Sequence, residues 1–517
     1  MPRLVKTAPK EFQMHSIFRK TSLALAAFAS LTMLAPAAYA AGEAKNVIFF
    51  LGDGMGPVTV TAARIYKGEK QLATQPGSLK SSEYAKLQMQ SLPYAARVKT
   101  FSLDGQTTDS APSMSAYMTG VKMNNEVISM SAETSAVDGS GKQYINGEDT
   151  TCPPGNGRPA QTLLELSKAL GRSVGAVSTT RVGHATPAAT YAHICNRNGY
   201  NTIAEQSVPG HANYNLKLGD GVDVLMGGGQ RNYFPKSTAG SKRSDEVNLV
   251  DMMKAKGYSF VSKGSELAAL DATKAGKLLG LFTQSEMSYE LDRVKQNKDE
   301  PSLADMTTKA LDVVSRNNKG FFLMVEGGRI DHALHGTNAK RALEDTLAFD
   351  KAIESAMAYM QKKDPGLKNT LIVVTADHDH NMVFNGYSKL GNPILGKVAD
   401  YQSGNLSKDA NGKPYTTLVF GNGGRPNGTA SSQVNPEDGN KAWIAPARGT
   451  SRDDLTAVDT TDDNFLQEVG INLGTPGSET HGGGDVMLFA SGAGAKIFKG
   501  TMDNTKVFSK VREAAGL

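Results

Sequence analysis

The sequence predicts an α/β fold: a three-layer α/β/α sandwich with a large mixed, mainly parallel central sheet and a loop-rich insertion. Apolar runs typical of buried parallel strands recur along the chain, and segments with helical spacing alternate with them. Polar residues stand at the ends of several runs, and open α/β sheets bind their ligands at the carboxyl ends of strands. The same pattern therefore predicts where a functional site would form.

Five apolar runs are the predicted strands. They are NVIFFLGDGMG (46–56), SVGAVSTTRVGHATP (173–187), FFLMVEGGRIDHALH (321–335), LIVVTADHDH (371–380) and HGGGDVMLFASG (481–492). Helical spacing occurs in 159–171, which ends at a glycine, and in 338–363. Between about 381 and 480 the chain is rich in Gly, Asn, Ser and Pro, which predicts the loop-rich insertion.

The first forty residues have the features of a secretory signal peptide. A positive segment at 19–20 precedes an apolar stretch rich in Ala and Leu, and 38–40 is a cleavage signal of the A-x-A type. We therefore expect a signal peptide at 1–40, a mature domain at 41–517, and export across the inner membrane to the periplasm or beyond it. Residues 1–13 precede a second methionine and are interpreted as an artefact of the assumed start. A short membrane anchor is the alternative, but the apolar stretch is short for a span.

Charge and cysteine content narrow the classes of function. The chain has 56 basic and 51 acidic residues, and 1–40 holds five and one of these, which leaves 51 and 50 in the mature part. This balance does not favour a nucleic-acid partner, and without a later long apolar stretch we expect no membrane anchor in the mature chain. Cys152 and Cys195 could form a disulfide or remain two buried thiols. Two cysteines are too few for a structural thiolate zinc site, so a metal would need His and carboxylate ligands.

Residues able to bind metals gather at the predicted strand ends. Seven of the eight histidines in the mature chain fall in or beside these segments. Each motif alone is weak, because a DxxxH spacing usually lies on a solvated surface and a strand that ends in Asp-Gly is often only a turn. Together they predict a metal centre. Its candidate ligands are Asp53, Thr186, Glu326, Asp331, His335, Asp377, His378 and His481.

The candidate ligands divide by chemistry into three groups. Asp331 and His335 are spaced to share one face of a helical turn, and His481 would complete a three-ligand site with an open position, as in catalytic zinc sites. A second site of nitrogen and oxygen ligands would use the two residues of TADH, with a contribution from Asp53. The third group offers only oxygens, which suits magnesium. Its members are Asp53, Thr186 and Glu326.

Ser110 is the candidate nucleophile. It follows Asp109 at the start of the helix-like segment 107–122, where free N–H groups and the helix dipole favour an anion. An ordinary N-cap is the alternative, and the nearby metal ligands decide for a serine activated by zinc. Arg197 could grip two phosphate oxygens with its guanidinium, although a single arginine is usually a surface residue.

These segments resemble the signature segments of alkaline phosphatases. The matching stretches are NVIFFLGDGMG, TDSAPSMSAYMTGVK, STTRVGHATPAATYAH, NRNGY, FFLMVEGGRIDHALH, TADHDH and ETHGGGDV, in the family's order and over nearly the whole mature chain. The resemblance is to vertebrate-type and some marine-bacterial members, because His184 and His332 stand where enteric bacterial members have Asp and Lys. It implies hydrolysis of phosphate monoesters at alkaline pH through a phosphoserine, with two zinc ions and one magnesium ion.

The resemblance also implies a role for each motif residue. Ser110 would be the nucleophile and Arg197 would orient the phosphate. The first zinc would take Asp331, His335 and His481; the second Asp53, Asp377 and His378; the magnesium Asp53, Thr186 and Glu326. Supporting positions beside these ligands are implied for Asp109, His184, His332 and His380.

Two other classes of protein compete with this interpretation. A phosphodiesterase or sulfatase of the same metal-dependent superfamily is the first, but SAPSM lacks the arginine of a sulfatase motif and the Thr186–Glu326 pair argues against a diesterase. A periplasmic phosphate- or zinc-binding protein without turnover is the second, but it would not need a serine beside an open metal site. We also expect a homodimer and small-molecule phosphate monoesters as partners.

Overall fold

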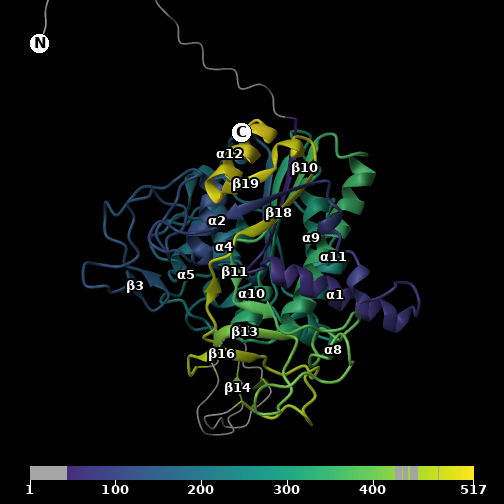
Figure 1. Cartoon of the computed structure of the whole chain (residues 1–517). Helices are drawn as coiled ribbons and strands as arrows, with labels where there is room; N and C mark the ends of the chain where they lie inside the picture. The colour runs from purple at the N-terminus through teal and green to yellow at the C-terminus, as the bar shows by residue number, and fades with distance from the viewer. Residues whose placement is uncertain (1–42, 425–432, 435–440, 443–451, 476) are drawn as a thin grey trace, which may run out of the picture. The chain divides into compact units, whose positions relative to one another are not determined.

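The computed structural model describes residues 43–517 except 425–432, 435–440, 443–451 and 476 (Figure 1). The predicted signal peptide at 1–40 lies outside the described residues. Within them, ten strands form one mixed sheet. In sheet order these are β19 (Gly500–Asp503), β2 (Tyr94–Lys99), β18 (Val486–Gly492), β10 (Thr370–Thr375), β1 (Asn46–Gly52), β9 (Phe321–Gly327), β5 (Ser173–Arg181), β6 (Val224–Gly228), β8 (Lys277–Leu281) and β7 (Tyr258–Val261).

Central strands β1, β9 and β10 are buried on both faces, apart from the half-buried Asn46. This explains their continuous apolar sequences, because a parallel sheet covered on both sides leaves no position for an alternating polar face. From β10 to β7 every neighbouring pair is parallel, whereas β18 is antiparallel to both β10 and β2. The predicted α/β class and the mixed, mainly parallel sheet are confirmed.

The predicted strand runs extended past the real strands. β5 ends at Arg181 and β9 at Gly327, and the rest of each run opens a short helix. These helices are α4 (Ala185–Tyr191) and α10 (Arg329–His335). Period-two and buried-run patterns do not separate a buried strand from the buried helix turn that follows it. The polar motifs of these runs are therefore on helices that leave the carboxyl edge of the sheet.

Helices pack in two groups, one on each face of the sheet. The first group contains α1 (Pro57–Thr74), α9 (Leu303–Val314), α10 and α11 (Ala339–Lys363), and the second contains α2 (Ser110–Thr119), α3 (Leu163–Ala169), α4 and α12 (Asn504–Ala515). Both α9 and α3 contact β5 and β9, so the two groups lie on opposite faces, as Figure 1 shows for α9 and α11 against α2 and α4. The remaining helices are α5 (Tyr200–Gln206), α6 (Leu249–Ala255), α7 (Gly264–Ala269) and α8 (Glu290–Lys295).

The two predicted helices are present with adjusted ends. α11 begins after Asn338, whose side chain accepts from the Arg341 N–H, and spans the predicted 338–363 almost fully. The segment 159–171 forms a shorter helix, α3, because Thr162 caps it together with Glu165 in a capping box. Side-chain capping therefore sets both helix starts more sharply than the apolar spacing did.

The described part of 381–480 is mostly loops around a small sheet of β12 (Met382–Phe384), β13 (Leu418–Gly423) and β16 (Glu468–Asn472). A two-stranded ribbon of β11 (Asp379–His380) and β17 (His481–Gly482) joins its two ends. Other short strands are β3 (Ile145–Asn146), β4 (Asp149–Thr150), β14 (Gln433–Val434) and β15 (Lys441–Ala442). The insertion thus leaves and re-enters the main domain at one place, beside the carboxyl edge of β10.

Cys152 and Cys195 form a disulfide that joins positions 43 residues apart. Cys195 is buried, and Arg197 follows it by two residues. We expect the double variant Cys152→Ser/Cys195→Ser to unfold at lower urea concentration, with about 4 kcal/mol less free energy of unfolding on the loop-entropy estimate. Urea titration followed by circular dichroism measures this, and equal midpoints for the two proteins would contradict it.

Candidate active site

The strand register brings the predicted ligands to one edge of the sheet. Glu326, in β9, lies beside Leu51 of β1 and Ser178 of β5, and Leu51 also pairs with Thr375 of β10. Asp53 and Asp377 follow these strand ends by one and two residues. Because β18 runs antiparallel to β10, its beginning rather than its end lies at this edge. This is why His481, which precedes β18, can reach residues that follow the parallel strands.

Ser110 is the first residue of α2, and Asp109 caps that helix by accepting from the Ala111 N–H at 2.7 Å. The Oγ atom of Ser110 lies 3.2 Å from His378 Nε2 and 3.4 Å from Asp53 Oδ1, and Ser110 is almost fully buried. Free N–H groups at the start of a helix favour an anion in front of them. The structure therefore places the candidate nucleophile at a helix N-terminus, beside two candidate metal ligands.

The second predicted metal group converges on His378 Nε2. This atom lies 3.2 Å from Asp53 Oδ1 and 3.4 Å from Asp377 Oδ2. The other ring nitrogen, Nδ1, lies 3.2 Å from the carbonyl of Asp379. An N–H at Nδ1 satisfies that carbonyl and leaves a lone pair on Nε2, so a cation could bind between the imidazole and the carboxylates.

In the first predicted group, imidazole Nε2 atoms again converge on a carboxylate. His335 Nε2 and His481 Nε2 lie 3.1 Å apart, and they lie 3.3 Å and 3.5 Å from Asp331 Oδ1. His335 Nδ1 faces the carbonyl of Glu479, and His481 Nδ1 faces the carbonyl of Thr108 at 2.7 Å. Both imidazoles are thus oriented by backbone carbonyls with Nε2 directed at the carboxylate. Two imidazole lone pairs and a carboxylate oxygen this close together repel one another, and a cation bound between them would remove that repulsion.

Asp53 also belongs to the third group. One ligand atom each from Asp53, His184 and Glu326 lie within 4.8 Å of one another. Among the described residues, several buried atoms here have no hydrogen-bond partner: Asp53 Oδ2, Asp377 Oδ2, Glu326 Oε1, Thr186 Oγ1 and His184 Nδ1. Buried polar atoms normally find a partner, because an unpaired one costs free energy. The four unpaired oxygens fit a hard cation at this position.

Burial and mutual repulsion control the ionisation of these groups. Burial, and next the charge of Asp377, raises the pKa of Asp53 well above its usual value. Burial also raises the pKa of Glu326 to about 8, against a hydrogen bond from Ser178 and with a contribution from Asp377. Burial lowers the pKa of His378 to about 3. The imidazole is therefore neutral, as metal binding requires, while the crowded carboxyls need a proton or a cation.

His380 differs from the histidines that are candidate metal ligands, because both of its ring nitrogens face carboxylates. Its Nε2 lies 2.8 Å from Asp331 Oδ1 and its Nδ1 lies 2.6 Å from Glu479 Oε2. Burial alone would lower the pKa of His380, but the two carboxylates, Glu479 foremost, raise it to about 10. His380 therefore donates to both partners and has no lone pair for a metal, which agrees with the supporting role expected for it.

Arg197 lies beside the nucleophile and is fixed by two partners. Its NH1 donates to Asp109 Oδ1 at 2.9 Å, and its NH2 lies 3.0 Å from His184 Nε2. Since a guanidinium can only donate, His184 accepts at Nε2 and carries its proton on Nδ1. The predicted phosphate clamp, the helix cap and the nearby histidine thus form one connected unit next to Ser110.

Sequence reasoning missed two residues of the site. Glu479 precedes His481 by two positions and contacts the imidazoles of His335 and His380. Arg329 donates from NH1 to His332 Nδ1 at 2.8 Å. Arg329 is completely buried, with its guanidinium 3.8 Å from the centre of the Tyr289 ring. Both stand inside motifs used for the prediction. A charged residue close to a candidate ligand in the sequence was therefore the signal that could have revealed them.

Gly54 in the GDGMG motif is required by both its conformation and its surroundings. It has a φ of 64°, and a Cβ there would lie 2.4 Å from His380 Nε2. Its N–H donates to Asp377 Oδ1 at 3.0 Å. The glycine therefore allows the turn after β1 to approach the candidate metal ligands closely.

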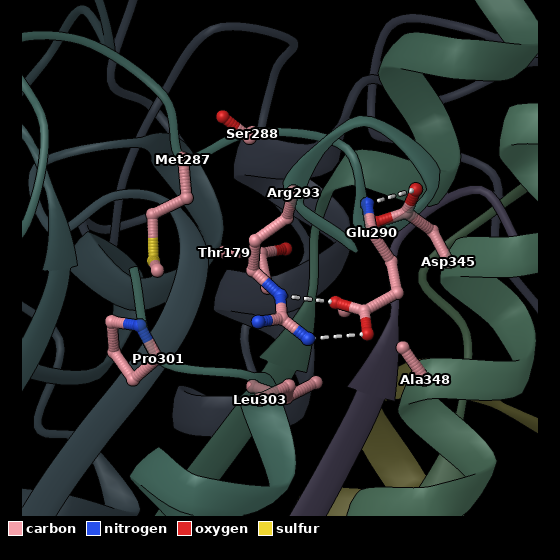
Figure 2. Close-up of a pocket in the computed structure, with 10 residues that line it drawn as sticks. Thr179, Met287, Ser288, Glu290, Arg293, Pro301, Leu303, Asp345 and Ala348 are labelled. Atoms are coloured by element: carbon pink, nitrogen blue, oxygen red, sulfur yellow. Dashed lines mark hydrogen bonds and ion pairs between the residues drawn. The ribbon is translucent and has the colours of Figure 1, made fainter. Parts of the chain in front are cut away.

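A small cavity lies behind the site, next to the ends of β5 and β9 (Figure 2). Figure 2 shows Arg293 paired with Glu290 through two hydrogen bonds of 2.7 Å, and Asp345 facing the backbone N–H of Glu290. The cavity measures about 10 Å³, which is room for about one water molecule. It is too small for a substrate, so it is not a binding pocket.

The family model of alkaline phosphatase matches residues 44–517. The chain belongs to the alkaline phosphatase family. The mouse (Mus musculus) alkaline phosphatase, tissue-nonspecific isozyme, is 36% identical over 491 residues, which cover 90% of this chain and 82% of that protein. The cod (Gadus morhua) alkaline phosphatase is 35% identical over 485 residues, 90% of each chain.

Solved structures agree with this membership. The alkaline phosphatase of Thermus thermophilus is similar with a TM-score of 0.62 and 26% identity, over 92% of each chain. A cold-active alkaline phosphatase from a Shewanella species has a TM-score of 0.58 and 25% identity, over 91% of this chain and 99% of that one. The family and the fold predicted from the motifs are confirmed, and the chain is an enzyme, a phosphomonoesterase.

Alkaline phosphatases are metal-dependent, and the structure holds groups of residues that could bind metal ions. All four of these groups contain predicted ligands. Two of them also include His380, whose ring nitrogens both donate to carboxylates, and one of these two adds Glu479. In the described part of the chain, no helix is both long and apolar enough to cross a membrane.

Proposed function

We propose that this alkaline phosphatase hydrolyses phosphate monoesters at alkaline pH through a phosphoserine at Ser110. The position of Ser110 Oγ carries the proposal: it lies 3.2 Å from His378 Nε2 and 3.4 Å from Asp53 Oδ1, at the start of α2. A hydroxyl in this place has a helix N-terminus and candidate metal ligands beside it. The helix N-terminus favours the alkoxide over the neutral hydroxyl, and a cation bound by those ligands would favour it further.

Two zinc ions and one magnesium ion are the proposed cofactors. Mixed imidazole and carboxylate ligands suit zinc, and a set with only oxygens suits magnesium. Bound here, such ions would lower the pKa of a hydroxyl and stabilise negative charge on oxygen. The proposed ligands are Asp331, His335 and His481 for the first zinc; Asp53, Asp377 and His378 for the second; and Asp53, Thr186 and Glu326 for magnesium.

The reaction proceeds in two displacements at phosphorus. Ser110 Oγ attacks, a bond forms between Oγ and phosphorus, the bond to the ester oxygen breaks, and the released alcohol takes up a proton. Water then attacks the phosphoserine, which frees inorganic phosphate and restores the serine hydroxyl. Arg197, held by Asp109 at 2.9 Å, binds two phosphate oxygens in both steps. Positioning and charge neutralisation supply most of the rate in phosphoryl transfer.

Hydrolysis of p-nitrophenyl phosphate at alkaline pH tests this function. We expect activity in protein loaded with zinc and magnesium, loss with a chelator, and recovery when both metals are added back. Bis(p-nitrophenyl) phosphate and p-nitrophenyl sulfate are measured in parallel, and faster cleavage of either would replace the monoesterase proposal with a diesterase or sulfatase. Phosphate binding by the loaded protein without turnover would indicate the binding-protein alternative.

We propose export through a cleaved signal peptide at 1–40, a periplasmic or extracellular location, and a homodimer. Large apolar side chains exposed on the insertion, among them Tyr387, Leu390 and Ile471, are the kind of surface that a second copy would cover.

A further inference from the structure

Glu479 is a buried carboxylate at the end of the insertion, and its three oxygen atoms all face the metal-ligand region. The residue is 1% exposed. Its Oε2 lies 2.6 Å from His380 Nδ1, and its Oε1 accepts from the Asn381 N–H at 2.9 Å. Its backbone carbonyl faces His335 Nδ1. One residue therefore contacts both a candidate first-zinc ligand and the histidine that supports another.

The contacts of Glu479 differ from those of the proposed metal ligands. Each side-chain oxygen is already occupied by an N–H donor, one from an imidazole and one from the backbone. By contrast, Asp53 Oδ2 and Asp377 Oδ2 have no partner among the described residues. The side chain of Glu479 reaches Asp331 through His380, whose Nε2 lies 2.8 Å from Asp331 Oδ1. These contacts are those of a positioning residue, since carboxylates behind a histidine fix its ring and orientation.

The two ends of the insertion are joined at the same place. His380 in β11 pairs with His481 in β17, so the insertion leaves directly after one imidazole and returns directly before another. Asn381 Nδ2 donates to the carbonyl of Thr480 at 2.7 Å. Thr480 N–H donates in turn to Asn422 Oδ1, in β13 of the insertion, at 3.0 Å. The stem of the insertion and the first-zinc ligands are thus one hydrogen-bonded unit with Glu479 at its centre.

We propose that Glu479 positions the Asp331–His335–His481 group and couples metal binding at that group to the docking of the insertion. The inference rests on the metal sites of the proposed function and adds a role for the segment 382–423 and 452–480. A ligand group that closes around an ion holds β17 against β11, and Glu479 transmits that constraint to the stem. Without the carboxylate, the ion would bind less tightly and the stem would gain less order from it.

The test compares zinc affinity in native protein and in Glu479→Gln, by competition with a chromophoric chelator. Glutamine keeps the shape but weakens the hydrogen bond to His380, and we expect the affinity of one zinc equivalent to fall about 10- to 100-fold. Glu479→Asp withdraws the carboxylate by one methylene and should lower affinity as well. Glu468→Gln is the matched control, because Glu468 is a buried carboxylate of the insertion that is paired with Arg452 at 2.7 Å, not with a histidine.

Hydrogen exchange supplies the second readout. In native protein, added zinc should slow exchange of the amides in 379–384 and 478–482, and this protection should shrink in Glu479→Gln but not in Glu468→Gln. Equal zinc affinity and equal protection in native protein and Glu479→Gln would overturn the inference. If Glu479→Gln shows both effects but native protein hydrolyses no monoester, the proposed function fails and the positioning role stands. If native protein binds no zinc, both fail.

Discussion

Replacing Ser110 with alanine is expected to lower kcat for p-nitrophenyl phosphate at least about 1,000-fold, because it removes the oxygen proposed to attack phosphorus. Ser110 Oγ is the hydroxyl next to both His378 Nε2 and Asp53 Oδ1. Alanine removes only that oxygen and keeps the helix start, whose cap comes from Asp109. Metal content and thermal unfolding should therefore change little.

Ser115→Ala is the matched control on the same helix. Ser115 is equally buried, and its Oγ accepts from the Ser129 N–H at 2.9 Å, away from the metal ligands. Its loss should lower stability and leave kcat within a few fold. Acid quench followed by mass spectrometry should find phosphate on the peptide that contains Ser110 in native protein and in Ser115→Ala, and no phosphate on that peptide in Ser110→Ala. Retention of full activity by Ser110→Ala, or phosphate on another residue, would contradict the proposed intermediate.

The fold was predictable where burial alone decides structure. β1, β9 and β10 are continuous apolar sequences because helices cover both faces of the sheet, and such sequences leave few other assignments. The ends of β5 and β9 were less predictable, because the buried turns that follow them are as apolar as the strands. The antiparallel direction of β18 was not predicted, since an apolar run carries no information on its direction in the sheet.

The sequence was enough to predict the candidate ligands of the site, but not the residues that hold its histidines in place. The ligand types Asp, His, Glu and Thr stand in motifs with a metal chemistry of their own, and the structure brings them together. Glu479 and Arg329 have no such pattern in the sequence, since a charged residue two or three positions from a histidine is common. Their significance comes from burial and from which nitrogen each contacts, and both depend on segments far apart in the chain.

Asp53→Asn is the second variant with a large expected effect. Asp53 is the carboxylate proposed to serve both the second zinc and the magnesium, so one substitution disturbs two sites. We expect elemental analysis to fall from about three metal ions per chain to about one, and kcat to fall at least about 1,000-fold. Full metal content in the variant would show that Asp53 is not a shared ligand.

Stability should respond to Asp53→Asn in opposite directions with and without metal. Burial and neighbouring carboxylates, Asp377 foremost, raise the pKa of Asp53 above its usual 3.8 in the metal-free fold. The folded state therefore holds a proton that the unfolded chain releases, and the stability from this group is lost as the pH rises above that value. Asparagine cannot ionise, so in the presence of chelator the melting temperature of the variant should exceed that of native protein at pH 8. This difference in melting temperature should shrink toward pH 4.

With zinc and magnesium present, the order should reverse, because ions that bind only the folded state stabilise native protein more. Asp350→Asn is the control. Asp350 is also a buried carboxylate, but it accepts from the N–H groups of Gln88 and Met89 at 2.9 Å and 3.0 Å and pairs with Lys67. Its substitution should lower the melting temperature in both conditions. An Asp53→Asn variant that is destabilised with and without metal alike would make Asp53 a structural carboxylate. A reversal for Asp53 alone would identify a carboxylate whose charge the fold tolerates only beside a cation.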